Sequence, residues 1–161
     1  MDEVVDLYET ALIRWADEQA RALRAAAASR VNLPIDWENV AEEIESLGKS
    51  QRSELRSRLA TIVEHLLKLA YSPAQDPRDG WRDTVRRERR DVGAVLDDNS
   101  SLRREVAGLI DWASLHSGRL VHDNLSDHHE VDRAAATEIA GRRFTEEQVL
   151  GNWFPEPQDG R

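Results

Sequence analysis

The sequence has no cysteine, and this absence excludes several classes of protein. Disulfide frameworks, thiolate metal sites and cysteine nucleophiles all need a thiol. Long apolar runs are also missing, since no stretch approaches the roughly 18 uninterrupted apolar residues of a membrane-spanning helix. The acidic start, Met1-Asp2-Glu3, differs from the basic start of a secretory signal peptide. We therefore expect a soluble cytoplasmic protein that does not bind membranes.

Motifs of common enzyme chemistry are missing as well. The sequence contains no phosphate-binding loop, no Gly-rich dinucleotide fingerprint and no Gly-x-Ser-x-Gly elbow. Nucleotide and nucleophilic chemistry therefore have no support, and no cofactor is predicted. The net charge of -9 opposes binding to a phosphate backbone, which draws its affinity from cationic side chains. The charge thus disfavours nucleic acid as a partner.

What the sequence does contain is helical periodicity. Apolar residues recur at steps of three and four in several segments, which is typical of amphipathic helices. We predict such helices over residues 4–28, 81–96, 102–121 and about 131–140. The turn-rich residues 72–80 and the polar residues 122–129 are predicted to be loops.

The most distinctive segment is residues 36–48, which begins with a helix start signal. Asp36 is placed as an N-cap, and carboxylates follow it near the positive end of the helix dipole. The apolar positions of this segment continue in phase across Gly48 as far as Leu69. A glycine inside a helix costs only about 1 kcal/mol, whereas a true turn usually resets the phase. The pattern predicts one long helix over about residues 36–71.

The C-terminal part carries a second start signal. Residues 145–148, Thr-Glu-Glu-Gln, fit a capping box, with Phe144 and Val149 placed as a hydrophobic staple. We expect a short capped helix, after which residues 153–155 dock on the protein and residues 156–161 fray.

Together these segments predict an all-α fold. We expect a helical bundle of about five main helices, with the long helix at its centre, forming a single domain over residues 1–161.

Further motifs recur along the chain at Tyr8, residues 15–19, residues 36–48, Leu55, Arg58, Leu59, residues 65–68, Trp81, residues 84–86, Arg89, Arg90, residues 101–103, residues 145–150 and residues 153–155. Together these motifs resemble those of a bacterial family known as domain of unknown function 29. The resemblance implies an all-helical fold of bacterial origin and no established activity. The chain departs from the family pattern between about residues 112 and 143, where residues 141–144, Gly-Arg-Arg-Phe, replace a Cys-Pro-Tyr-like element. A site that other members form there is not carried over to this chain.

Carboxylates and a histidine form the first candidate site. Glu42, Glu43 and His65, joined by Glu45, have side chains that could hold a metal ion or transfer protons. The Glu-x-x-His pairs of bundle metal sites are missing, however. On a continuous helix Glu42 and His65 would lie about 35 Å apart, so only a sharp turn at Gly48 or a second subunit could unite them. A metal-assisted hydrolase is therefore the alternative, and a structural role is preferred.

Opposite charges on two predicted helices form the second candidate. Glu38, Glu42, Glu43 and Glu45 belong to the long helix, and Arg86, Arg89 and Arg90 belong to the helix over residues 81–96. Arginine forks on these carboxylates would fix the register of the two helices, whereas separate solvated faces would add little stability. Both interpretations stay open. Phosphate contacts by Arg86, Arg87, Arg89 and Arg90 are a weaker alternative.

The predicted loop over residues 122–129 holds the third candidate. His122, Asp127, His128 and Asp132, with Asp123 and His129 beside them, are of residue types that bind zinc or nickel. Neighbouring histidines point apart on a helix, so they could share an ion only in an irregular segment. We therefore favour a solvated loop.

The function predicted from the sequence is that of a non-enzymatic helical module that binds a protein partner or a second copy of itself. This prediction depends on abundant amphipathic helix without a chemical motif.

Overall fold

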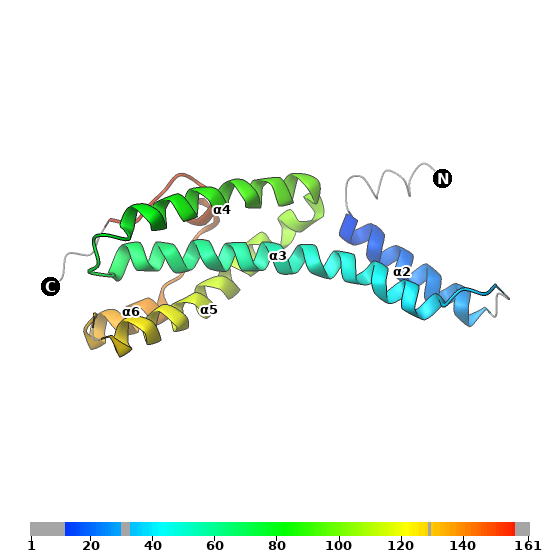
Figure 1. The fold of residues 1–161 in the computed structure, drawn as a ribbon, viewed down its shortest axis with the longest axis horizontal. Coiled ribbons are helices and arrows are strands. Elements are labelled where there is room, and N and C mark those ends of the chain that lie inside the picture. Colours follow the sequence, from blue (N-terminus) through cyan, green and yellow to red (C-terminus); the bar gives the residue numbers. More distant parts are fainter. Residues whose placement is uncertain (1–11, 30–32, 129, 157–161) are drawn as a thin grey trace. The chain divides into compact units, whose positions relative to one another are not determined.

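The computed structural model describes residues 12–29, 33–128 and 130–156. These residues form six α-helices and one 3-10 helix, as Figure 1 shows. The prediction of an all-α fold is confirmed. The elements are α2 (Leu12–Ala28), α3 (Trp37–Tyr71), α4 (Arg78–Asp98), η1 (Ser100–Glu105), α5 (Val106–Asp127), α6 (Arg133–Gly141) and α7 (Glu146–Leu150).

The chain forms two compact units. Unit 1 consists of Met1–Leu55 and Ala94–Arg104, and unit 2 consists of Arg56–Gly93 and Glu105–Arg161. Helices α3 and α4 contribute to both units. None of the helices in the described ranges is both long and apolar enough to cross a bilayer.

The long helix α3 is confirmed by the structure. It begins after Asp36, whose carboxylate accepts a hydrogen bond of 3.3 Å from the backbone N–H of Asn39. This contact satisfies one of the free N–H groups of the first turn, as an N-cap does. Gly48 lies inside the helix and does not end it.

Unit 1 is built around the pair α2 and α3, which run side by side in Figure 1. Helix α2 buries Ile13, Ala16 and Ala20. A β-carbon built on Gly48 would lie 3.5 Å from the Cα of Ile13 and 3.7 Å from the Cβ of Ala16. The small residues thus let the two helix backbones approach closely. The predicted residues 4–11 of the first helix lie outside the described residues.

In unit 2, α3 lies between α4 and the pair α5 and α6 (Figure 1). The half of α3 that belongs to this unit, residues 56–71, supplies several large, fully buried apolar side chains. The hydroxyl of Ser117 on α5 donates to the carbonyl oxygen of Ala60 on α3 at 2.9 Å. Helices α5 and α6 approach closely at Gly118, where an added β-carbon would lie 3.1 Å from the carbonyl oxygen of Ile139. The fully buried leucine and isoleucine side chains of this half of α3 are Leu59, Ile62, Leu66, Leu67 and Leu69.

The predicted start of the helix over residues 81–96 was wrong by three residues. Helix α4 begins at Arg78 and contains Gly80. The Arg78 side chain is buried and donates to the carbonyl oxygens of Leu69 and Ser72. These carbonyls at the end of α3 have no hydrogen-bond partner within the helix. Arg78 supplies the missing donors, and this contact fixes where α4 starts.

The loop predicted over residues 122–129 was also wrong for most of its length. Helix α5 is preceded by the 3-10 helix η1 and continues to Asp127. Its last turns bury Val121 and Leu125, and it packs along α6. Tertiary burial therefore overrides the low helix propensity of the polar residues between them. Residue His129 lies outside the described residues.

The C-terminal start signal is confirmed. Thr145 and Gln148 form a complete capping box at the start of α7, and Phe144 and Val149 beside it are both buried. The following segment docks on the protein as expected, because the ring of Trp153 lies 6.3 Å from that of Phe144. Of the tail predicted to fray, residues 157–161 lie outside the described residues.

Candidate interaction surface

The hairpin of α2 and α3 presents three kinds of side chain around α3. Positions seven residues apart in an α-helix differ by only about 20° around its axis, so each such pair shares a face. The first pair, Glu38 and Glu45, carries charge. The second pair, Ala41 and Gly48, is buried against α2.

An ion-pair clasp closes the charged edge of the hairpin. Arg24 on α2 donates from Nε to Glu38 at 3.1 Å and from Nη2 to Glu45 at 3.0 Å. The hydrogen bond from Arg24 lowers the pKa of Glu45, and Lys49 at 3.1 Å lowers it further. The hydrogen bonds that Arg24 donates to Glu45 and Glu38 raise the pKa of Arg24 in turn. The clasp is exposed, so it fixes the register of the helices more than it adds stability.

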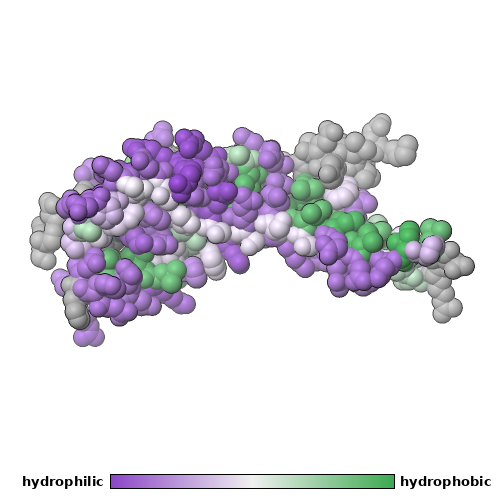
Figure 2. Space-filling view, viewed as in Figure 1, coloured by the Kyte–Doolittle hydropathy of each residue, from purple (hydrophilic) through white to green (hydrophobic). Residues whose placement is uncertain are grey.

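Apolar side chains gather on the other edge. Val40 and Leu47 form the third pair, with exposed fractions of 40% and 48%, and Ile44 lies between them, half-buried. We call Val40, Ile44 and Leu47 the apolar row. Leu33 and Ile35 in the connector before α3 are exposed too, and Figure 2 shows the apolar surface over this hairpin.

Small residues on the neighbouring face of α3 explain why the apolar row is exposed. Ala41 and Gly48 occupy the contact with α2 because they allow close approach, and the row is turned about 100° away from that contact. The apolar stripe predicted from the sequence therefore leaves its first part exposed, and it is buried only from Leu55 onward. The pair of small residues seven positions apart is the sequence signal that marks the packed face.

The candidate catalytic residues are divided between the two units. Glu42 and Glu43 are exposed in unit 1, and His65 is half-buried in unit 2. The Nδ1 atom of His65 lies 2.8 Å from the carbonyl oxygen of Thr61 on its own helix. Because a carbonyl only accepts, Nδ1 carries the proton in the neutral ring and Nε2 is the acceptor.

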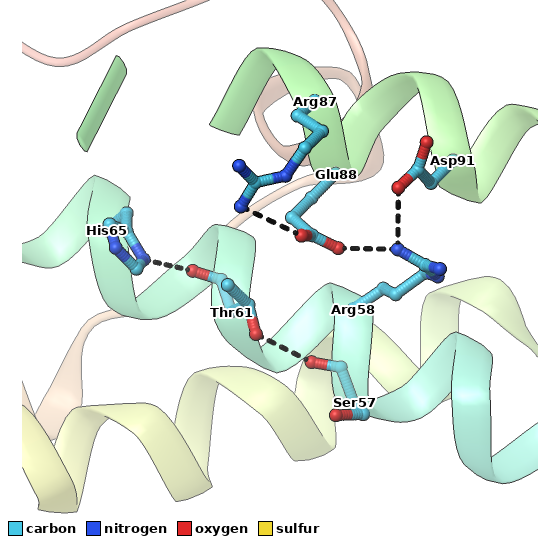
Figure 3. Close-up of polar contacts among 7 residues, drawn as sticks. All are labelled: Ser57, Arg58, Thr61, His65, Arg87, Glu88 and Asp91. Carbon is cyan, nitrogen blue, oxygen red and sulfur yellow. Dashed lines mark hydrogen bonds and ion pairs between the residues drawn. The ribbon is translucent and has the colours of Figure 1, made fainter. Parts of the chain in front are cut away.

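Polar contacts of Arg58, two turns before His65, connect α3 to α4, as Figure 3 shows. Arg58 on α3 donates to Glu88 at 2.9 Å and to Asp91 at 2.8 Å on α4. Arg87 lies 3.5 Å from the other oxygen of Glu88. A half-buried arginine that binds two carboxylates fixes the register of two helices. Sequence reasoning missed this group, because the charges are separated by about thirty residues.

Several members of the predicted charge network have other partners. Glu38 and Glu45 bind Arg24, and Arg86 binds Asp83 on its own helix at 2.9 Å.

Arg89 binds backbone carbonyl groups of the C-terminal segment and not a carboxylate. It donates to the carbonyl oxygens of Gln148 and Val149 at 2.8 Å and of Trp153 at 2.7 Å. Burial lowers the pKa of Arg89, and the nearby charge of Arg86 lowers it further. The ring of Phe154 lies beneath the Arg89 guanidinium at 4.9 Å. Arg89 thus holds the end of α7 and the residues after it against α4.

The candidate metal ligands are only partly brought together. His122 and Asp132 line a shallow cavity of about 350 Å³ between α5 and α6. The other interactions of these side chains are local: His122 contacts Asp123, His128 contacts the carbonyl oxygen of Asn124, and Asp132 caps α6. Asp127 is exposed at the end of α5. Within residues 12–29, 33–128 and 130–156, no three His, Asp or Glu side chains are placed to hold one metal ion.

Fold and surface together define an all-α protein with an exposed apolar face on a helical hairpin. The chain belongs to the family described as domain of unknown function DUF29, whose model matches residues 7–150. The resemblance predicted from the sequence is therefore confirmed.

The chain is also similar to a crystal structure from Rhodospirillum rubrum described as an alpha-helical protein of unknown function. The two are 23% identical, the match covers 92% of this chain and 98% of the other, and the TM-score is 0.65. At this identity the likeness shows the fold alone. No curated protein matches the chain.

Proposed function

We propose that this protein is a helical protein-interaction module that binds its partner through the apolar row of α3. The exposure of Val40 and Leu47 on one face carries the proposal. Burying such a side chain from full exposure contributes about 1.5–3 kcal/mol. Val40 and Leu47 are 40% and 48% exposed, so a partner that covers them gains roughly half of that from each. Amphipathic helices with anchors at these spacings are a recurring mode of protein recognition.

The arrangement of the row matters more than the exposure of its members. Leu115 and Leu120 on α5 are exposed to a similar extent, 41% and 51%. They are five positions apart, however, and so lie about 140° apart around their helix. Scattered apolar residues are common on protein surfaces, whereas a contiguous apolar face marks an interaction site. The α5 pair therefore serves as a matched control.

The test compares two double variants of the full chain. One carries Val40→Ser and Leu47→Ser, and the other carries Leu115→Ser and Leu120→Ser. Circular dichroism checks that helix content is unchanged. Self-association is measured by light scattering, and association with other proteins by quantitative affinity enrichment from the cells that make the protein.

We expect the row variant to weaken association at least about tenfold, because two apolar anchors are lost. The α5 variant should associate like the wild type. Equal association of the wild type and the row variant would contradict the proposal, as would equal losses in the two variants.

A further inference from the structure

The apolar row is bordered by negative charge. Residues three and four positions apart are neighbours on a helix surface. Glu43 lies three positions after Val40 and four before Leu47, so it adjoins both anchors. Asp36 lies four positions before Val40, at the start of the helix. Both carboxylates are exposed, and neither has an ion-pair partner among the residues that the structure describes.

Two basic residues of the hairpin, Arg24 and Lys49, are held on the opposite edge of α3. Arg24 is held by Glu38 and Glu45, and Lys49 binds Glu45. The other neighbours of Val40 and Leu47 at these spacings are apolar or uncharged: Trp37, Ile44, Ser50 and Gln51. The border of the row is therefore acidic and uncompensated.

The acidic border distinguishes between two possible occupants of the apolar row, a second copy of this chain and a cationic partner. A second copy would bring another acidic border against the first, in a chain whose net charge is already -9. Like charges placed together across an interface suppress binding, whereas opposite charges favour it and speed encounter. A cationic partner gains from the same two carboxylates that a second copy must overcome.

We infer that the occupant of the apolar row is a basic amphipathic helix of another protein. The inference rests on the proposed function and names the class of partner. Val40 and Leu47 are two turns apart, about 10 Å along the helix, so they fit apolar residues seven positions apart on the partner. Lysine or arginine beside those residues would reach Glu43 and Asp36.

The experiment uses two fluorescent helical peptides with the same apolar residues at seven-residue spacing. One carries lysine and arginine beside them and the other carries glutamate. Their binding to the full chain is measured by fluorescence anisotropy at low and moderate salt. We expect the basic peptide to bind at least tenfold more tightly than the acidic one, and more weakly as salt rises.

Variants of the full chain separate this inference from general charge attraction. The Val40→Ser and Leu47→Ser double variant keeps the charge and should weaken binding of the basic peptide at least tenfold. Glu43→Gln should weaken it about two- to fivefold. Asp111→Asn removes an exposed carboxylate on α5 and should leave binding unchanged.

Three results of the peptide experiment would overturn the inference. The basic peptide could fail to bind, it could bind the row variant as tightly as the wild type, or the acidic peptide could bind equally well. A dimer that dissociates in the row variant would identify a second copy as the occupant. That result would refute the inference and leave the proposed function intact, whereas associations that all persist in the row variant would refute the proposed function.

Discussion

Substitutions at Gly48 test the packing of α2 on α3, which turns the apolar row outward. Replacing a glycine by alanine inside a helix gains about 1 kcal/mol of stability. At Gly48 the added methyl group would meet Ile13 and Ala16 at 3.5–3.7 Å, which is ordinary van der Waals contact. Burial of that methyl adds about 0.8 kcal/mol. We therefore expect Gly48→Ala to stabilise the hairpin by about 1–2 kcal/mol.

Leucine at the same position should have the opposite effect. Alanine and leucine have similar helix propensities, so propensity alone predicts the same gain. The larger side chain has no room between the backbones of α2 and α3, and overpacking of this kind costs about 1–3 kcal/mol. Gly108 on α5 is the matched control, because an added β-carbon there meets nothing within 4 Å. Both substitutions at Gly108 should stabilise its helix by about 1 kcal/mol.

Hydrogen–deuterium exchange of the peptides covering α2 and the first half of α3 measures the local effect. Slower exchange in Gly48→Ala together with faster exchange in Gly48→Leu supports the packing described here. If Gly48→Leu protects the hairpin as well as Gly48→Ala does, then α2 does not pack on Gly48 and the orientation of the apolar row is wrong.

Two further predictions concern charged groups. The Arg24 clasp lowers the folded-state pKa of Glu45 below its ordinary value of 4.5, so the stability it contributes is present above that pH and is lost as pH falls through the folded pKa. The protection factors of the hairpin amides, which relate each exchange rate to the intrinsic rate at the same pH, should therefore fall in acid, and less so in Glu45→Gln. Arg89→Lys removes donors from three carbonyls and should lower the free energy of unfolding by about 2–3 kcal/mol in chemical denaturation, whereas Arg86→Lys on the exposed face of α4 should change it by less than about 0.5 kcal/mol. Equal effects of the two lysine variants would contradict the role given to Arg89.

Local signals in the sequence predict much of this fold. The cap at Asp36, the capping box at Thr145 and the phase running through Gly48 each depend on residues within a few positions of one another. Such patterns report backbone geometry directly, because capping and periodicity are local properties. The all-α class and the long helix therefore follow from the sequence.

The predictions of helix boundaries were wrong where tertiary contacts determine the boundary. The end of α5 is helical because Val121 and Leu125 are buried, although the residues around them favour a loop. Helix α4 starts early because Arg78 caps the end of α3. No local pattern contains either contact, since both depend on chain segments that meet only after folding.

The interaction surface was only half predictable. The sequence marks Val40, Ile44 and Leu47 as one apolar stripe, but it does not say whether another helix covers them. The small residues Ala41 and Gly48 let α2 pack on the neighbouring face of α3, and the pairing of Arg24 with Glu45 across 21 positions fixes the register of that packing. Opposite charges at such separations have many possible partners, so the clasp could be found only in the structure.

The most direct test of the central claim is site-specific photo-cross-linking in the cells that make the protein. A photoreactive side chain is placed at Leu47 in the apolar row and, as a control, at the equally exposed Leu120 on α5. The account predicts a discrete cross-linked product from position 47, containing another protein, and none from position 120. No product from position 47, or the same product from both positions, would contradict it.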